Sequence, residues 1–477
     1  MKTINSILLV VFIGIFAGCG LSKIDNYTTS DKVVEIFPDY TDITIPPNIA
    51  PLNFKIQVEA DEYFVEIKNN DDHVIKVKST DGNIDIPIEQ WKRLLKDNRG
   101  KQITFSVYTK KEEWTKYPDI VNHIAKEEID SHLVYRLLYP GYELWNEMGI
   151  YQRNLESFDE SPVVENKALE KGCVNCHSFA ANSPDNMMFH VRGKLGGTVI
   201  INQKGLKKKN IKREDMPRGA VYPSWHPSGK YIAFSSNKIK QYFHAKGSKY
   251  IEVSDFDSDL ILYDVDGEKV ERYDAVAKKE YMETFPTWSP DGKYLYFTRA
   301  VKIPENGDIK DVRYNLIRVA VDAQGKPLEK PEVVIDAAAE GKSVAFPRIS
   351  PNGKYLVYTL ADYGNFTIWH EEADLYCLNL KTLKSEKLTL NSENVESYHS
   401  WSSNSNWMVF SSKRHDGHSA LPYFAYIDSN GISHKPFVLP QRNPEFYNRF
   451  LKTYNIPEFI KSAIPVTEWQ IVNTIRN

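Results

Sequence analysis

The sequence has 477 residues, of which 42% are hydrophobic and 26% are charged, and its formal net charge is −3. This composition is typical of a globular chain of two or three domains. The nearly neutral charge balance and the lack of a basic domain argue against a nucleic-acid-binding protein. Tyr, Phe and Trp are abundant (28, 22 and 9), and with 25 Pro and 24 Gly they favour short strands joined by tight turns.

The first 19 residues have the pattern of a lipoprotein signal peptide. Lys2 supplies the positive charge, and the apolar stretch 4–16 is shorter than the roughly 20 residues of a membrane span. The run 16–19, Phe-Ala-Gly-Cys, resembles a bacterial lipobox with Phe in place of the usual Leu, which implies that Cys19 is lipidated. An ordinary signal peptide followed by an incidental Cys is the alternative. We expect an exported, membrane-anchored lipoprotein, and the lack of an acidic run after Cys19 favours the periplasmic face of the outer membrane.

Residues 20–50 are polar and show little pattern, which predicts a flexible tether. Residues 51–112 then contain runs in which apolar and polar residues alternate, the pattern of strands with one buried face. Several such strands within so short a segment predict a small immunoglobulin-like or fibronectin-like β-sandwich, interrupted by one short helix near residues 88–95.

A repeated motif dominates the second half of the chain. Segments 222–234, 285–297 and 346–358 read almost alike, and a weaker copy covers 398–410. In each copy an apolar strand leads into a turn, and in the three clear copies Pro fixes φ in that turn and Gly accepts a positive φ; an alternating strand follows. A second hairpin follows in every unit, so each unit has the four strands of a β-propeller blade. These repeats, over residues 220–435, resemble those of TolB-like propellers.

An all-β chain with a six-bladed propeller is therefore predicted. The four clear repeats account for four blades, a fifth begins at 187–201, and a sixth combines 133–154 with a strand from the C-terminal region. By this interpretation residues 113–186 are a connector that carries the first propeller strands and the segment described next. Residues 187–440 form the blades, and 441–477 are a tail with a helix at 444–454.

Residues 173–177 read Cys-Val-Asn-Cys-His, the attachment signature of a c-type haem. Cys173 and Cys176 can each form a thioether to one vinyl group of the same haem. His177 can then serve as the proximal ligand of the iron. The motif predicts one covalently attached haem c.

Three other uses of this cysteine pair stay open: a structural disulfide, a thioredoxin-like redox pair, or half of a zinc site. A zinc site needs further ligands, and the other cysteines after the signal peptide are Cys19 and Cys377. Cys377 lies in an apolar strand, where a buried inert thiol is the simplest interpretation. No α/β pattern surrounds the motif, which argues against a thioredoxin-like pair.

The strand-like run 187–192 offers candidates for a second iron ligand. Met188 and His190 share one face of this strand, because strand side chains alternate, and Met187 lies on the other. A methionine ligand would raise the reduction potential of the iron, whereas a histidine would leave it lower. An iron with no second protein ligand is the remaining alternative.

Residues 131–265 resemble a group of TolB-like lipoproteins with a haem motif from Bacteroidetes-type bacteria. The resemblance rests on runs at 139–143, 172–179, 189–193, 196–198 and 225–229. The resemblance implies the architecture of the protein and says little about its activity.

Two weaker patterns accompany the motif. Lys204, Lys207–Lys209, Lys212 and Arg213 form a basic loop that could steer an acidic redox partner or be a solvated blade tip. Asp255, Asp257 and Asp259 could bind calcium or serve in a turn and strand start. The chain contains neither a Gly-X-Ser-X-Gly nor a His-Glu-X-X-His run, which argues against a hydrolase.

Three functions remain open from the sequence. The first is electron transfer by a one-haem envelope protein that docks with other redox proteins and binds no nucleic acid. The second is a non-redox propeller that binds envelope proteins or a ligand in its central channel. The third is a small-molecule haem enzyme such as a peroxidase.

Overall fold

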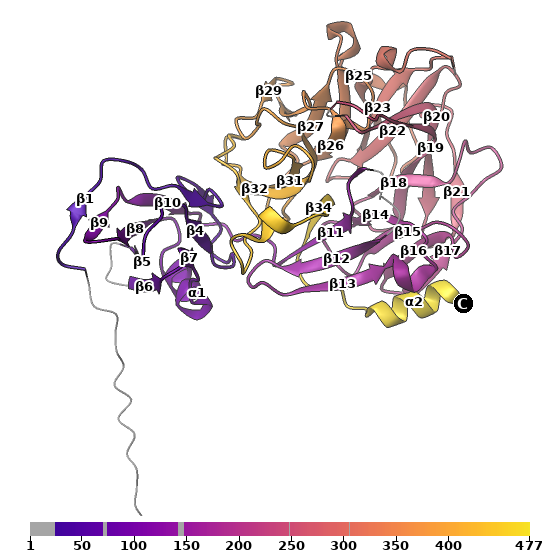
Figure 1. The fold of residues 1–477 in the computed structure, drawn as a ribbon. Coiled ribbons are helices and arrows are strands. Elements are labelled where there is room, and N and C mark those ends of the chain that lie inside the picture. The colour runs from indigo at the N-terminus through magenta and orange to yellow at the C-terminus, as the bar shows by residue number, and fades with distance from the viewer. Residues whose placement is uncertain (1–23, 70–73, 142–146, 248, 305) are drawn as a thin grey trace, which may run out of the picture.

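A computed structural model of the chain describes residues 24–69, 74–141, 147–247, 249–304 and 306–477. They form two units side by side, an N-terminal β-sandwich and a ring of β-sheets (Figure 1). Within these residues, no helix has the length and apolar character needed to cross a bilayer. Cys19 and the signal-like segment lie outside the described residues, as do residues 142 and 143 of the run 139–143.

The sandwich consists of a seven-stranded and a three-stranded sheet that share one hydrophobic core. The larger sheet contains β1 (Thr28–Thr29), β3 (Thr44–Ile45), β5 (Glu62–Lys68), β6 (Val74–Ser79), β8 (Gln102–Lys110), β9 (Trp114–Lys116) and β10 (Ile120–Ile124). The smaller contains β2 (Ile36–Phe37), β4 (Phe54–Ile56) and β7 (Asn83–Ile84). Helix α1 (Ile88–Asp97) buries Trp91, Leu94 and Leu95, so the expected sandwich with one helix is present.

The segment expected to be a tether is instead part of the sandwich from residue 28 onward. Strand β1 pairs in parallel with β9, and β3 pairs in parallel with β10. Val34, Ile36, Tyr40, Ile43 and Ile45 are buried. These strands are two residues long, too short to produce the alternating pattern by which the longer strands were predicted.

The ring has six blades, each a four-stranded antiparallel sheet, as predicted. From the axis outward, blades one to three contain β34 (Thr453–Ile460), β11 (His132–Leu138), β12 (Met148–Asn154) and β13 (Glu160–Glu165); β14 (Val174–Phe179), β15 (Met187–Val191), β16 (Gly197–Asn202) and β17 (Gly205–Lys209); and β18 (Ala220–Trp225), β19 (Tyr231–Phe243), β20 (Ile251–Asp264) and β21 (Lys269–Glu271). Blades four to six contain β22 (Tyr281–Trp288), β23 (Tyr294–Val301), β24 (Asn315–Ala320) and β25 (Glu332–Ile335); β26 (Ser343–Ile349), β27 (Tyr355–Ala361), β28 (Asp374–Asn379) and β29 (Ser385–Lys387); and β30 (Glu396–Trp401), β31 (Trp407–Ser412), β32 (Leu421–Tyr426) and β33 (Phe437–Val438).

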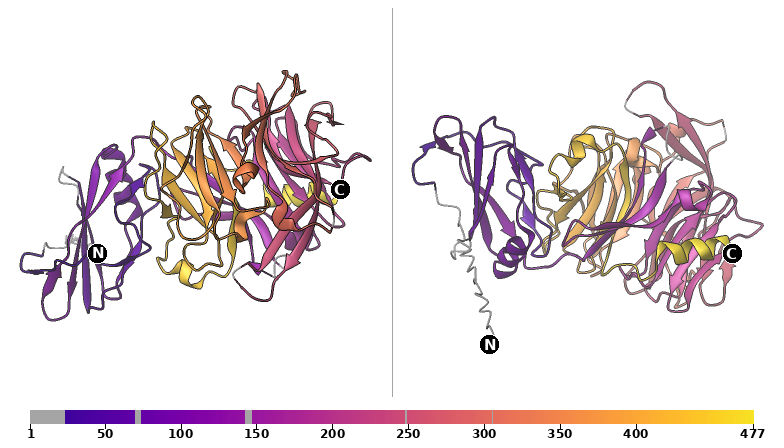
Figure 2. Two further views of the ribbon diagram at one scale, coloured as in Figure 1. Left: turned by 90° about the horizontal axis from the view of Figure 1, so that it is seen from above. Right: turned by 60° about the horizontal axis from the view of Figure 1, so that its bottom comes forward.

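Blade one closes the ring, because its innermost strand β34 comes from the C-terminal region and pairs with β11 (Figure 1). Figure 2 shows the ring from two further sides. The expected helix at 444–454 is wrong: a single 3-10 turn covers Phe446–Arg449, and β34 follows. A helix does form later, at α2 (Glu468–Arg476), where Thr467 and Gln470 make a capping box. Blade two likewise begins earlier than expected, at β14, which places residues 174–179 in an inner strand.

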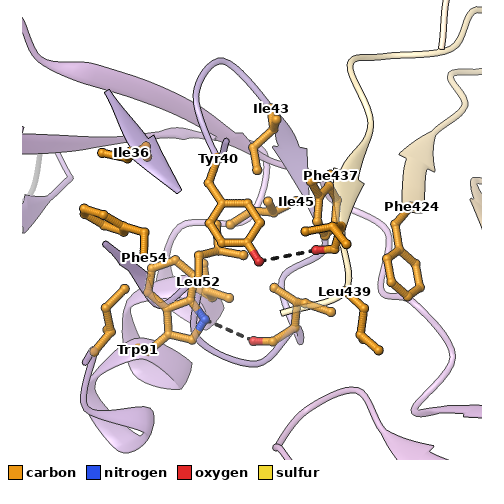
Figure 3. Close-up of a cluster of buried hydrophobic side chains, with 14 of the residues drawn as sticks. Ile36, Tyr40, Ile43, Ile45, Leu52, Phe54, Trp91, Phe424, Phe437 and Leu439 are labelled. Carbon is orange, nitrogen blue, oxygen red and sulfur yellow. Dashed lines mark hydrogen bonds between the residues drawn. The ribbon is translucent and has the colours of Figure 1, made fainter. Parts of the chain in front are cut away.

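The sandwich packs against blade six through a continuous hydrophobic core (Figure 3). Tyr40 and Ile45 from the sandwich belong to the same cluster as Phe424 and Phe437 from the blade. The Tyr40 hydroxyl donates a hydrogen bond to the Val438 carbonyl at 3.4 Å. The two units are therefore joined by buried contacts as well as by the chain.

Candidate functional site

Each of the six inner strands is interrupted by a β-bulge at which one residue that is not glycine has a positive φ of 49–53°. These residues line a narrow channel on the propeller axis. In blade order they are Ile456, Cys176, Tyr222, Phe285, Phe346 and Tyr398. The second cysteine of the haem motif thus occupies a position that four of the other blades fill with an aromatic residue.

This correspondence shows that the motif is also a disguised copy of the blade repeat, which the sequence analysis missed. Residues 176–179 occupy the same four strand positions as residues 398–401 of blade six. The first segment reads Cys-His-Ser-Phe and the second Tyr-His-Ser-Trp. Trp225 donates its indole N–H to the Ser178 carbonyl, as Trp288 does to the Ser224 carbonyl one blade further on. The recurring His-Ser pair and the aromatic residue after it are the signals that could have identified the repeat.

His177 is buried, with 2% of its surface exposed, and neither ring nitrogen makes a hydrogen bond of standard geometry, although the carbonyls of Ile456 and Val134 lie near the ring. Burial and the nearby Arg136 lower the pKa of His177 to about 3, although the carbonyls of Ile456 and Val134 act in the opposite direction. His399 occupies the same position in blade six, and its Nε2 donates a hydrogen bond to the Val357 carbonyl at 2.8 Å. His177 is therefore a neutral imidazole without such a bond, which is the form that binds metals.

The two cysteines of the motif lie in different surroundings, and both thiols are free. Cys176 lines the axial channel and also a wider cavity at its mouth. Cys173 lines neither, because it packs with Leu169 and Val191 in the apolar core between blades one and two. Burial raises the pKa of the Cys173 thiol. The chemistry of Cys176 and His177 fits haem attachment, whereas Cys173 has to leave its core contacts to form the second thioether.

The cavity at the mouth of the channel has a volume of about 570 Å³, within the range of small-molecule and cofactor sites. Its wall includes aromatic side chains at Tyr222, Phe366, Trp369 and Tyr398. It also includes basic side chains, namely Arg136, Arg192, Arg218, Lys413, His190 and His418. No Asp or Glu lines it among the residues that the structure describes.

Five residues of this wall carry a buried polar atom without a hydrogen-bond partner in the protein. The atoms are Arg136 Nε, Asn175 Oδ1, His190 Nε2, Asn237 Oδ1 and Lys413 Nζ. Each such atom costs about 1–3 kcal/mol of folding free energy when it stays unpaired. Because proteins pair nearly all of their buried polar groups, five such atoms in residues that line one cavity mark it as the candidate ligand site.

Of the candidates for a second iron ligand, only His190 lines the cavity, and the two methionines do not. His190 lines the cavity, shares a 2.9 Å hydrogen bond between Nδ1 and Thr198 Oγ1, and leaves Nε2 unpaired. Burial and Arg192 lower the pKa of His190 to about 3, so its ring is neutral. Met188 and Met187 are fully buried in apolar clusters on the two faces of the blade, and neither lines the cavity.

Most charges of the basic loop are already paired within the protein. Lys204 bonds Asp266 at 2.6 Å, Lys209 bonds Glu268 at 2.6 Å, and Arg213 binds Asp215 through two nitrogens. These exposed ion pairs weaken the positive field that a docking face for an acidic partner would need.

The three aspartates considered for calcium are also committed to protein partners. Asp255 is buried and accepts hydrogen bonds from Asn237, Tyr314 and Asn365. Asp257 pairs with Lys302 at 2.7 Å, and Asp259 with Arg272 at 3.1 Å. Among the described residues, no group of three or more His, Cys, Asp or Glu could hold a metal ion.

These features define a six-bladed β-propeller with a cavity on its axis, joined to a β-sandwich. No family model and no curated protein matches the chain. Solved structures with a similar fold include oligogalacturonate lyase from Vibrio parahaemolyticus (14% identity, 61% of this chain and 71% of that chain, TM-score 0.35) and puromycin hydrolase (12%, 64% and 45%, TM-score 0.39). A third is the β-propeller domain of Cps50 (Swd1) from Myceliophteria thermophila (13%, 56% and 70%, TM-score 0.33).

Proposed function

We propose that this chain is an exported lipoprotein of the cell envelope that carries one covalent haem c on its propeller and transfers electrons. The observation that carries the proposal is His177, a neutral buried imidazole whose nitrogens make no standard hydrogen bond, directly beside Cys176 in the axial channel. The lipid anchor at Cys19, the periplasmic face of the outer membrane and the likeness to TolB-like haem lipoproteins belong to the same proposal and rest on the sequence.

In this proposal Cys176 and Cys173 attach the haem and His177 binds its iron. A haem held by these residues would supply one-electron redox chemistry at its iron. His190 is the preferred second ligand, because it lines the cavity, its Nε2 is unpaired and its hydrogen bond to Thr198 orients the ring. Burial of His177 and His190 would restrict the access of water to these ligands, which tunes the reduction potential of a bound iron.

The absorption spectrum of protein purified from a host that matures c-type cytochromes tests the proposal. We expect one haem per chain, a reversible change between oxidised and reduced spectra, and haem mass on the peptide that contains Cys176. Cys176→Ser should abolish covalent haem, whereas Cys377→Ser, which alters a cysteine outside the motif, should leave it unchanged. Colourless protein with a Cys173–Cys176 disulfide would refute the haem proposal.

The alternative of a non-redox ligand-binding propeller is favoured by the polar atoms that the cavity leaves unpaired. In that case colourless protein should bind a small molecule in the cavity. The enzyme alternative predicts instead that the reduced protein binds carbon monoxide at an open iron position. A second ligand such as His190 would prevent such binding.

A further inference from the structure

Lys413 is the least satisfied charge in the cavity wall. It follows β31 in blade six and has 3% of its surface exposed, and its Nζ has no hydrogen-bond partner. Its Nζ lies 2.9 Å from the centre of the Trp369 ring, which makes a cation–π contact when the amine is protonated. Burial lowers the pKa of Lys413 well below its usual value, although Asp416 and Glu371 act in the opposite direction.

The rest of the wall shares the sign of this charge. Arg136, Arg192 and Arg218 line the same cavity, and no carboxylate lines it within the described part of the chain. Only Lys413 among these four is buried, whereas Arg136 is partly exposed and Arg192 and Arg218 are exposed. A charge at Lys413 without an anion is costly, because the buried group loses its hydration. A cavity of this kind is complementary to a negatively charged ligand.

We propose that Lys413 is the charge partner of a carboxylate group on the ligand that fills this cavity. The inference rests on the cavity being a ligand site, which is part of the proposed function, and it names the chemistry of that ligand. Two sources supply the same chemistry: a propionate of the haem, or a free organic acid.

Two amide oxygens in the wall help to separate these sources. The Asn237 side chain donates its N–H groups to Asp255 and Thr284, and its Oδ1 has no partner in the protein. Asn175 Oδ1 is also unpaired. A hydroxylated acid would satisfy both oxygens and the cations, whereas an ionised haem propionate offers acceptors alone.

The experiment has two arms, both with the full chain produced without cytochrome maturation. In the first, haemin and its dimethyl ester, which lacks both carboxylates, are titrated while tryptophan fluorescence is recorded. In the second, D-glucuronate and uncharged D-glucose are titrated by calorimetry. Wild type is compared with Lys413→Met, with Lys413→Arg, and with Lys293→Met at an exposed turn as the matched control.

We expect the acid in at least one arm to bind at least tenfold more tightly than its uncharged counterpart. Lys413→Met should remove this advantage, and Lys413→Arg should keep most of it. Lys293→Met should match wild type. The arm that responds identifies the source, and the second arm stands even when the protein proves to be colourless and the haem proposal fails. Three results would overturn the inference. The acid and its uncharged counterpart bind equally well, Lys413→Met leaves the advantage of the acid unchanged, or neither arm shows binding.

Discussion

Three buried histidines, His177, His190 and His399, influence stability through their protonation. Burial lowers the pKa of each to about 3 from a usual value of 6.5. Below pH 6.5 these histidines bind protons in the unfolded chain, whereas their buried rings stay neutral in the folded chain. The stability that each neutral ring contributes is therefore complete above pH 6.5 and is lost as the pH falls towards 3.

Buried carboxyl groups act with the opposite sign. Burial raises the pKa of Asp255 to about 6 and of Glu283 and Glu458 to about 7. Between their unfolded and folded pKa values these groups stabilise the fold more as the pH falls. The pH dependence of the whole protein is consequently a sum of opposing contributions, and a single histidine has to be isolated by substitution.

His399→Gln isolates one such contribution, since His399 lies outside the haem motif. The variant should be less stable than wild type at neutral pH, because it disturbs the hydrogen bond with the Val357 carbonyl. Its deficit should shrink by about 2 kcal/mol between pH 6.5 and about pH 5, since the variant has no ring to protonate on unfolding. Urea unfolding of both proteins at the two pH values measures the difference. A deficit that stays constant would mean that His399 titrates normally in the folded protein.

Among the structural elements, the Pro-X-Gly turns between the first and second strands of the blades make matched comparisons possible. Gly292 and Gly353 have almost the same φ, 70° and 71°, in equivalent turns of blades four and five. A Cβ at Gly292 would lie 2.6 Å from His226 Nε2 of the preceding blade. A Cβ at Gly353 would come no closer than 4.0 Å to any neighbour.

Gly353→Ala should cost about 1–2 kcal/mol of unfolding free energy, because an L-residue is strained at this φ. Gly292→Ala should cost about 1–3 kcal/mol more, since the His226 ring must move as well. Chemical denaturation of both variants measures the difference. Equal losses of unfolding free energy would show that the His226 ring moves aside without an energetic penalty. This contact between the blades would then be loosely packed.

At the scale of the whole molecule, one strand from the C-terminal region holds the ring together. Strand β34 pairs with β11 and contacts β14 and β30 on either side, so blade one is completed by residues that are distant in the sequence. An open ring would leave the edge of β11 unpaired and the inner faces of the neighbouring blades exposed.

A chain that stops after residue 452 should therefore lose the cooperative unfolding transition and become sensitive to protease. A chain that stops after residue 461 is the matched control, because it keeps β34 and loses α2. It should remain folded but less stable, since Ile471 and Ile475 of α2 are buried against blade two. Calorimetry and limited proteolysis compare the two chains. Cooperative unfolding of the shorter chain would contradict ring closure by β34.

Much of the fold could be predicted because its signals are local. The Pro-X-Gly turns of blades three to five and the alternating strands of blades three to six each lie within a dozen residues, so their pattern survives in one sequence. The two-residue strands β1, β2 and β3 could not be recognised, because each contributes too few residues for a period. The helix expected at 444–454 failed for a different reason, because β34 is needed to complete blade one.

The sequence by itself determined the residue types and spacing of Cys173, Cys176 and His177, since covalent chemistry depends on neighbours along the chain. Tertiary structure alone decided that Cys176 faces the axial cavity while Cys173 packs in a core between blades. It also brought Lys413 and Trp369 from blades six and five to the cavity that His190 of blade two lines. The physical reason is ring closure, because six inner strands converge on one axis and bring together residues that no local pattern connects.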